Sequence, residues 1–211
     1  MKFLSQETYD SARASKHGRE VQDIMKNSIV GVAGLGGLGS NICNMLARMG
    51  VGKLIVADFD TVSITNMNRQ NYLMKHFSMY KTDATEDILR MIDPYARVEK
   101  HTVKITPENV KEVFNGCDIV CEAMDLATEK TMFINEILAQ CPAVKIVAGS
   151  GMAGYGRSNE IRTEKKLDRL YICGDGVDME DKDSVMIPSR VMLCAAQMAN
   201  TVIALLANKD V

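Results

Sequence analysis

A glycine-rich turn followed by an acidic residue is the part of this chain best suited to chemistry. Residues 34–39 fit the pattern Gly-x-Gly-x-x-Gly, after an apolar run at 29–33 and before a helix-like stretch. Such glycines permit a tight turn and a close approach of the backbone to phosphate, while the helix start offers free N–H groups to an anion. Asp58 ends a second apolar run about 20 residues on, where a carboxylate accepts hydrogen bonds from ribose hydroxyls. The predicted nucleotide-binding residues of this unit are Gly34, Gly36, Gly37, Gly39 and Asp58.

The polar loop after Asp58 is not typical of a simple dinucleotide binder. A dehydrogenase usually proceeds from the acidic residue into its next helix, whereas this chain inserts a stretch carrying Asn66, Arg69 and Gln70. A lone Gly-x-Gly-x-x-Gly is a weak signal, but the strand before it and the helix after it make it strong here. The added polar loop indicates that the phosphates of the bound nucleotide are attacked.

Alternating apolar and helix-like segments predict the architecture that positions these residues. Continuous apolar runs are typical of strands buried on both faces. We expect strands at 29–33, 53–57, 97–103, 118–121 and 144–148, and helices at 40–49, 78–92, 107–114 and 128–140. Beyond residue 150 we expect short antiparallel strands at 157–162 and 170–172, an acidic loop at 174–183 and a long apolar helix at 188–206.

The predicted fold class is therefore α/β, a Rossmann-like, doubly wound and mostly parallel sheet with a short antiparallel C-terminal extension and a long C-terminal helix. We expect one domain over residues 1–211. It comprises a helical segment at 1–28, a nucleotide-binding core at 29–150 and a C-terminal extension at 151–211.

Composition narrows the class of protein. The 211 residues are 46% hydrophobic and 25% charged, which is ordinary for a globular protein. The formal net charge of −2 does not favour binding to nucleic acid or an anionic membrane. No apolar run reaches the ~20 residues that span a bilayer, and the N-terminus lacks a secretory signal, so we expect a cytoplasmic protein.

Six cysteines raise the question of a metal site. No two of them are spaced Cys-x-x-Cys, and Cys117 and Cys121 flank an apolar pair within an expected strand. We expect reduced, mostly buried thiols, with one reactive cysteine or a structural zinc as the alternatives.

At this point the sequence resembles a known family. The glycine turn, the pattern Asp-x-Asp-x-Val-x-x-x-Asn-x-x-Arg-Gln that begins at Asp58, and Lys81 near the next helix start are similar to the ThiF-type adenylyltransferases, bacterial relatives of ubiquitin-activating enzymes. The resemblance covers residues 28–150. The tail, LYICGD followed by IPSRV and an apolar helix, looks like the short ThiF-like subgroup linked to thiamine biosynthesis.

The resemblance implies an activity and a set of partners. Family members bind ATP with Mg²⁺ and activate the C-terminal Gly-Gly carboxylate of a ubiquitin-like sulfur-carrier protein (ThiS-like in thiamine biosynthesis) as an acyl-adenylate, releasing pyrophosphate. The family is dimeric, so a homodimer is implied. The same chemistry on a molybdopterin carrier, a peptide or a tRNA base is the first alternative, and a NAD-binding Rossmann protein is the second.

Site residues follow by the same resemblance. Arg69 and Lys81 would supply positive charge beside the phosphates. Asp125 would be the catalytic carboxylate that holds Mg²⁺. Nucleotide contacts would come from Asp60, Asn66 and Gln70. Plainer roles remain open: Lys81 solvated, Arg69 paired with Asp60 or another nearby carboxylate, Asp125 as the N-cap of the helix at 128–140, and Asn66 and Gln70 as ordinary loop residues.

The chain also departs from the family. Longer relatives carry two Cys-x-x-Cys pairs that bind zinc, and their absence here means that no zinc is expected. Some relatives use a loop cysteine to bind the carrier covalently, for which Cys173 lies in the corresponding region. Others supply an arginine from the partner subunit's N-terminal segment, for which Arg13 and, slightly less, Arg19 are the candidates.

Overall fold

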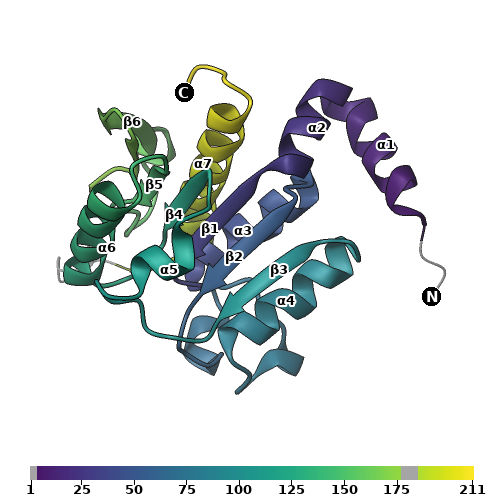
Figure 1. Cartoon of the computed structure of the whole chain (residues 1–211). Helices are drawn as coiled ribbons and strands as arrows, with labels where there is room; N and C mark the ends of the chain where they lie inside the picture. The colour runs from purple at the N-terminus through teal and green to yellow at the C-terminus, as the bar shows by residue number, and fades with distance from the viewer. Residues whose placement is uncertain (1–3, 177–184) are drawn as a thin grey trace.

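A computed structural model describes residues 4–176 and 185–211 and shows one seven-stranded sheet with helices on both faces (Figure 1). The strand order is β3-β2-β1-β4-β5-β7-β6. The strands are β1 (Ile29–Ala33), β2 (Lys53–Ala57), β3 (Arg97–His101), β4 (Ile119–Glu122), β5 (Lys145–Gly149), β6 (Arg162–Leu167) and β7 (Leu170–Gly174). All neighbouring pairs are parallel except β6 and β7, so the predicted fold class is confirmed.

The order of the strands defines where a ligand can bind. The chain winds outward from β1 through β2 to β3 and then returns to β4 on the other side of β1. In doubly wound sheets this reversal opens a crevice beyond the carboxyl ends of the strands. The glycine turn follows β1 and residues 123–126 follow β4, so both border that crevice.

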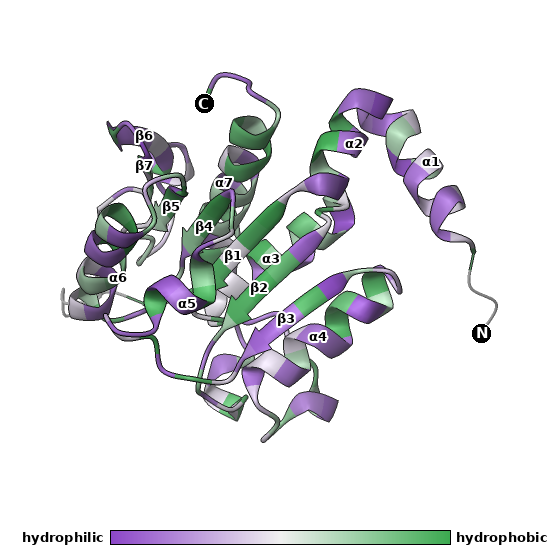
Figure 2. Ribbon diagram, in the orientation of Figure 1, coloured by the Kyte–Doolittle hydropathy of each residue, from purple (hydrophilic) through white to green (hydrophobic). Residues whose placement is uncertain are grey.

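The helices cover the two faces of the sheet unequally. They are α1 (Gln6–His17), α2 (Arg19–Asn27), α3 (Gly37–Met49), α4 (Lys81–Ile92), α5 (Val110–Phe114), α6 (Ala127–Gln140) and α7 (Pro188–Leu206), with short 3₁₀ turns η1 (Ile64–Asn66), η2 (Met74–His76) and η3 (Ser158–Glu160). Helices α3, α4 and α7 enclose one apolar cluster with the sheet. Helices α5 and α6 enclose a second one, and a third, small cluster lies between α4 and the loop after β2. Figure 2 shows hydrophobic residues along the central strands and hydrophilic ones over most of α1.

Helix α7 is a helix of the protein core that also passes a simple test for membrane spans. It is 19 residues long and apolar, and by length and composition alone it could cross a bilayer. Half of its apolar window is buried in this fold, and Val191, Cys194, Met198 and Val202 are fully buried against the sheet and α3. The predicted C-terminal helix is thus present and packs as expected.

The sequence prediction was wrong in the C-terminal extension. A strand was expected at 157–162, but Arg157 has a left-handed backbone (φ 44°) and η3 occupies residues 158–160. Three glycines with positive φ, Gly151, Gly154 and Gly156, precede it and turn the chain away from strand geometry. The outer strand β6 therefore begins only at Arg162. The expected acidic loop falls largely in residues 177–184, outside the described residues.

Candidate functional site

The turn between β1 and α3 requires glycine at two positions because other backbone lies against it. Gly34 has φ 88°, and a Cβ there would lie 2.7 Å from the carbonyl oxygen of Ala123. A Cβ on Gly39 would lie 1.8 Å from the carbonyl oxygen of Gly34. At Gly36 the ideal Cβ position meets only the Gln70 side chain, at 3.8 Å. The turn is closely packed beneath and open above Gly36, as a phosphate cradle must be.

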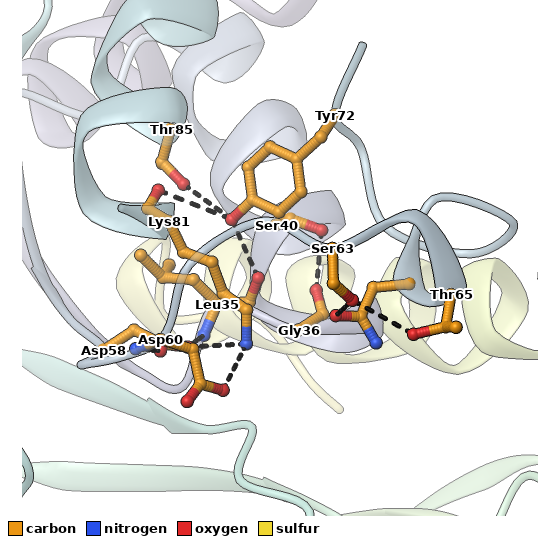
Figure 3. Close-up of polar contacts among 11 residues, drawn as sticks. Leu35, Gly36, Ser40, Asp58, Asp60, Ser63, Thr65, Tyr72, Lys81 and Thr85 are labelled. Carbon is orange, nitrogen blue, oxygen red and sulfur yellow. Dashed lines mark hydrogen bonds and ion pairs between the residues drawn. The ribbon is translucent and has the colours of Figure 1, made fainter. Parts of the chain in front are cut away.

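The carbonyl oxygens of this turn are held by side chains, which fixes the turn's conformation (Figure 3). The donors are Tyr72 Oη to Leu35 O (2.8 Å), Ser40 Oγ to Gly36 O (2.6 Å) and Asn41 Nδ2 to Gly37 O (2.7 Å). Ser40 and Asn41 each donate to the carbonyl oxygen four residues earlier, which is a common contact of such side chains in helices. Their positions just after the glycines could have predicted these two hydrogen bonds. No such signal in the sequence marks Tyr72.

Both carboxylate oxygens of Asp58 accept hydrogen bonds from backbone N–H groups, one of them in the glycine turn. Its Oδ2 accepts the Leu35 N–H at 2.7 Å, and its Oδ1 accepts the Asp60 N–H at 2.8 Å. Burial raises the pKa of the Asp58 carboxyl, an effect that Lys81 and the two N–H donors oppose. Each oxygen can accept a further hydrogen bond. The ribose contact expected of Asp58 stays a prediction, and the structure adds a turn-holding contact that the sequence did not reveal.

Lys81 is buried at the start of α4 and faces two carboxylates. Its Nζ donates to Asp60 Oδ2 at 2.7 Å and lies 3.6 Å from Asp58 Oδ2. The lysine side chain is only 7% exposed, so the alternative of a solvated Lys81 is wrong. Lys81 therefore offsets the negative charge of Asp58 and Asp60 beside the glycine turn.

The loop after β2 brings Arg69 to the turn without a counter-ion. Its guanidinium Nη1 donates to Thr65 O (3.3 Å) and Asn68 Oδ1 (3.1 Å). Among residues 4–176 and 185–211 it forms no ion pair, and Asp60 pairs with Lys81 instead. The alternative in which Arg69 pairs with Asp60 is therefore wrong.

The side-chain amide oxygens of Gln70 and Asn66 differ in whether they accept a hydrogen bond. Asn66 Oδ1 accepts a hydrogen bond from Ser63 Oγ at 2.6 Å. The Oε1 of Gln70 is buried, and within the part of the chain that the structure describes it meets no hydrogen-bond donor. Leaving a buried acceptor unsatisfied costs about 1–3 kcal/mol. The Nε2 of the same side chain lies 3.8 Å from the ideal Cβ position on Gly36, so Gln70 faces the open side of the glycine turn, where a nucleotide fits.

Asp125 lies on the adjacent turn, after β4. The preceding residues Ala123 and Met124 pack against Gly34, while Asp125 is exposed. Helix α6 begins at Ala127 with Leu126 as its N-cap and no side-chain cap bond, so the alternative of Asp125 as N-cap is wrong. In the described residues no three His, Cys, Asp or Glu side chains gather to hold a metal ion.

A buried ion pair that the sequence did not reveal supports the turn after β4. Both oxygens of Glu122, which is fully buried, accept hydrogen bonds from Lys130 Nζ on α6, at 2.9 and 2.8 Å. Glu122 Oε1 also accepts the Met124 N–H at 2.7 Å. Burial raises the pKa of the Glu122 carboxyl, and Lys130 opposes that rise. The pair closes the turn that carries Asp125.

The six cysteines are free and buried, which confirms the expectation of reduced core thiols. Cys173 is fully buried, and its Sγ lies 3.2 Å from Thr163 Oγ1. Burial raises the pKa of its thiol. A thiol that is inaccessible and protonated is a poor nucleophile, so this structure does not support a covalent role for Cys173.

The two N-terminal arginines lie away from the glycine turn of their own chain. Arg13 donates to the carbonyl oxygens of Ala47 (3.0 Å) and Arg48 (3.1 Å) and pairs with Asp93 at 2.8 Å. The two carbonyls lie at the C-terminal end of α3, about 15 Å along the helix from the turn. Asp93 directly follows α4. Arg19 is exposed at the start of α2. Arg13 therefore caps α3, a role that the sequence did not reveal.

Together, the strand order and the helices on both faces define a doubly wound α/β protein with a glycine turn after its first strand. A family model matches residues 9–211, and the chain belongs to the ThiF family. The expected family resemblance is therefore confirmed.

The names of similar proteins differ in what those proteins act on. The chain is 33% identical to the molybdopterin-synthase adenylyltransferase of Haemophilus influenzae over 133 residues, 63% of this chain and 53% of the relative. It is 33% identical to the tRNA threonylcarbamoyladenosine dehydratase of Bacillus subtilis over 138 residues, 64% and 54% respectively. The chain thus matches about half the length of these curated relatives.

Solved structures share the fold over the whole chain. A structure of the E. coli tRNA N6-threonylcarbamoyladenosine dehydratase in complex with ATP superimposes with a TM-score of 0.87 and 18% identity, covering 98% of each chain. At that identity the likeness establishes the fold alone.

Proposed function

We propose that this protein is an ATP-dependent adenylyltransferase that activates the C-terminal glycine carboxylate of a ubiquitin-like, ThiS-like sulfur-carrier protein, and that the whole chain acts as one cytoplasmic unit. The observation that carries the proposal is the pair of cations beside the glycine turn, Lys81 in its carboxylate pocket and Arg69 without a counter-ion. Membership of the ThiF family supports the reaction class.

The proposed reaction joins two anions, so the site must supply positive charge. The triphosphate of ATP would lie on the N–H groups of the turn and the N-terminus of α3. The carrier's carboxylate oxygen forms a bond to the α-phosphorus while the bond to pyrophosphate breaks, giving an acyl-adenylate. Arg69 and Lys81 would stabilise charge on the phosphate oxygens, and Gln70 would bond a ribose hydroxyl or a phosphate-bound water.

Magnesium fits the proposal through a single protein ligand. Mg²⁺ usually keeps waters and binds one or two carboxylates plus substrate phosphates. Asp125 is exposed at the crevice and has no hydrogen bond or ion pair to another described residue, so it is free to serve as that carboxylate. When bound, Mg²⁺ would neutralise phosphate charge. The chain's own contribution is to hold Asp125 on a turn fixed by Glu122 and Lys130.

The C-terminal segments and the names of similar proteins indicate the class of substrate. The LYICGD and IPSRV segments favour a carrier in thiamine biosynthesis. Two of the similar proteins are a molybdopterin-synthase adenylyltransferase and a tRNA threonylcarbamoyladenosine dehydratase. Those two names favour a second candidate, the same adenylation chemistry on a molybdopterin carrier or a tRNA base. We further propose a homodimer, as the family resemblance implies.

Nucleotide binding and two substitutions test the reaction class. Calorimetry should detect ATP binding and no NAD binding, since the inserted loop with Asn66, Arg69 and Gln70 after Asp58 is not typical of a simple dinucleotide binder. Arg69→Ala and Asp125→Ala should each abolish adenylation with the fold intact, and Arg90→Ala and Asp168→Ala are matched controls at exposed sites. Near-normal turnover in either site variant would refute its assignment, and NAD binding without ATP binding would refute the class.

A further inference from the structure

The side-chain amide of Asn41 joins the glycine turn to the loop that carries Arg69. Its Nδ2 donates to Gly37 O at 2.7 Å and to Arg69 O at 3.1 Å. Both acceptors are carbonyl oxygens, so the amide nitrogen, and not the amide oxygen, must face them. The nitrogen carries two hydrogens, one for each carbonyl. Asn41 is only 7% exposed, and its contact with the loop joins residues 28 positions apart.

The preceding residue, Ser40, makes the same kind of bridge. Its hydroxyl donates to Gly36 O at 2.6 Å (Figure 3) and accepts the N–H of Asn71 at 3.0 Å. The backbone on both sides of Gln70 is therefore held by adjacent side chains near the start of α3.

These contacts place two side chains of the loop against the turn. The ideal Cβ position on Gly37 lies 3.4 Å from Arg69 Cγ and 3.6 Å from Arg69 Cδ. The ideal Cβ position on Gly36 lies 3.8 Å from Gln70 Nε2. The stem of Arg69 thus packs on Gly37, next to the place where Gln70 faces Gly36.

The guanidinium of Arg69 is fixed relative to its loop rather than to the turn. Within the described part of the chain, its hydrogen bonds go to Thr65 O and Asn68 Oδ1, which belong to the same loop. Its position over the turn therefore depends on what holds the loop to the turn. Asn41 makes that contact at Arg69 itself, whereas Ser40 makes it two residues further on.

We propose that Asn41 is a positioning residue for adenylation, which sets the guanidinium of Arg69 relative to the glycine turn. The inference rests on the proposed adenylyltransferase function, in which Arg69 stabilises charge on the phosphate oxygens. A displaced guanidinium costs mainly the transition state, because a catalytic group must be aligned with the reacting atoms. The loop contact of Asn41 therefore acts on the maximal rate of adenylation, and its contact with Gly37 acts on the shape of the cradle and on ATP binding.

Two variants separate these contacts. A serine hydroxyl has one hydrogen, and Ser40 donates it to the carbonyl oxygen four residues earlier. By the same geometry Asn41→Ser keeps the hydrogen bond to Gly37 O and loses the one to Arg69 O. Asn41→Asp has nearly the same shape, but its carboxylate has no hydrogen to donate, so it loses both.

The matched control is Asn44→Ser, one turn further along α3. The Asn44 amide oxygen accepts Arg48 Nε at 2.7 Å on an exposed part of the helix, away from the loop. The same substitution there tests whether a serine in α3 is harmful in itself.

The assay is pyrophosphate–ATP exchange with Gly-Gly-ending carrier proteins of the thiamine and molybdopterin types, alongside ATP calorimetry and chemical unfolding. In Asn41→Ser we expect the maximal exchange rate to fall about tenfold or more, while the ATP Kd stays within about threefold. In Asn41→Asp the rate should fall and the ATP Kd should rise, since the turn is loosened as well. Asn44→Ser should leave both within about twofold of the native protein.

The outcomes distinguish this inference from the proposed function. A native exchange rate in Asn41→Ser would show that its loop contact is purely structural and would overturn the inference alone. An ATP Kd that rises in Asn41→Ser as much as the rate falls would also overturn it, because Asn41 would then act on the turn and not through Arg69. Asn41→Ser decides between these outcomes even if Asn41→Asp unfolds. Absence of exchange in the native protein with both carriers, despite ATP binding, would overturn the proposed substrate and the role of Asn41 in its adenylation.

Discussion

Tyr72 donates its hydroxyl hydrogen to the carbonyl oxygen of Leu35 at 2.8 Å, tying the loop after β2 to the centre of the glycine turn. The Tyr72 hydroxyl also lies 3.1 Å from Thr85 Oγ1, on α4. One buried side chain thus links the turn, the loop and the helix that carries Lys81. The cradle is held by the parts of the chain that also supply its cations.

Tyr72→Phe should therefore loosen the cradle. The substitution leaves the buried Leu35 carbonyl unsatisfied, so we expect the free energy of unfolding to fall by about 1–3 kcal/mol. The ATP Kd should rise several-fold because the turn is less fixed. Chemical unfolding and ATP calorimetry check both effects. Tyr95→Phe is the control, since its hydroxyl donates to Leu4 O far from the turn; an effect equal to that of Tyr72→Phe would contradict the account.

Lys81→Met should remove a cation needed for phosphoryl chemistry. Methionine matches the length of the lysine stem but leaves Asp58 and Asp60 facing each other without a counter-ion. We expect adenylation to fall by about 100-fold or more. Lys75→Met is the control, because Lys75 pairs with Asp87 at a half-exposed position. Adenylate formation measured by release of pyrophosphate checks this; retained activity in Lys81→Met would rule out its catalytic role.

The glycine turn and its acidic partner could be predicted because their spacing is local. The hydrogen bond of Tyr72 could not, because it joins residues 37 positions apart and depends on how the loop folds back. Arg13 was a candidate for reaching the ATP phosphates of a partner subunit, and within its own chain tertiary packing places it on the last carbonyls of α3. The strand expected at 157–162 failed because positive-φ glycines and Arg157 set the backbone there.

Arg13→Ala should destabilise the fold. It removes the donors to two helix-end carbonyls and strands Asp93, whose side chain is only 9% exposed. We expect the free energy of unfolding to fall by about 2 kcal/mol or more. Arg19→Ala, at an exposed site on α2, should change it by less than about 0.5 kcal/mol. If Arg13→Ala kept native stability and lost only activity, the capping role would be wrong and a role across the subunits would be favoured.

The buried thiols predict a loss of stability at alkaline pH. Burial raises the pKa of Cys43 from 9.0 to about 12 in the folded protein. Below pH 9 the thiol is protonated in both states, and above pH 9 only the unfolded state releases the proton. Stability is therefore lost as the pH rises from 9 towards 12, by about 1.4 kcal/mol per pH unit for each such thiol.

Cys43→Ala isolates this contribution from other groups that titrate near pH 10. Denaturant unfolding of the native and variant proteins at pH 8, 9 and 10 should show a smaller alkaline loss in the variant. Native thiols should also resist modification by a thiol reagent at pH 8 until the chain unfolds. Identical pH profiles, or rapid modification of the folded protein, would contradict the burial of Cys43.

Isotope exchange of pyrophosphate into ATP, with and without a Gly-Gly-ending sulfur carrier, tests the central claim most directly. Exchange reports reversible formation of the acyl-adenylate, since labelled pyrophosphate enters ATP only through that intermediate. The account predicts exchange that depends on the carrier and is lost in Arg69→Ala. Measurable ATP binding without exchange in the presence of any carrier would contradict it, and would turn attention to a different acyl or base substrate.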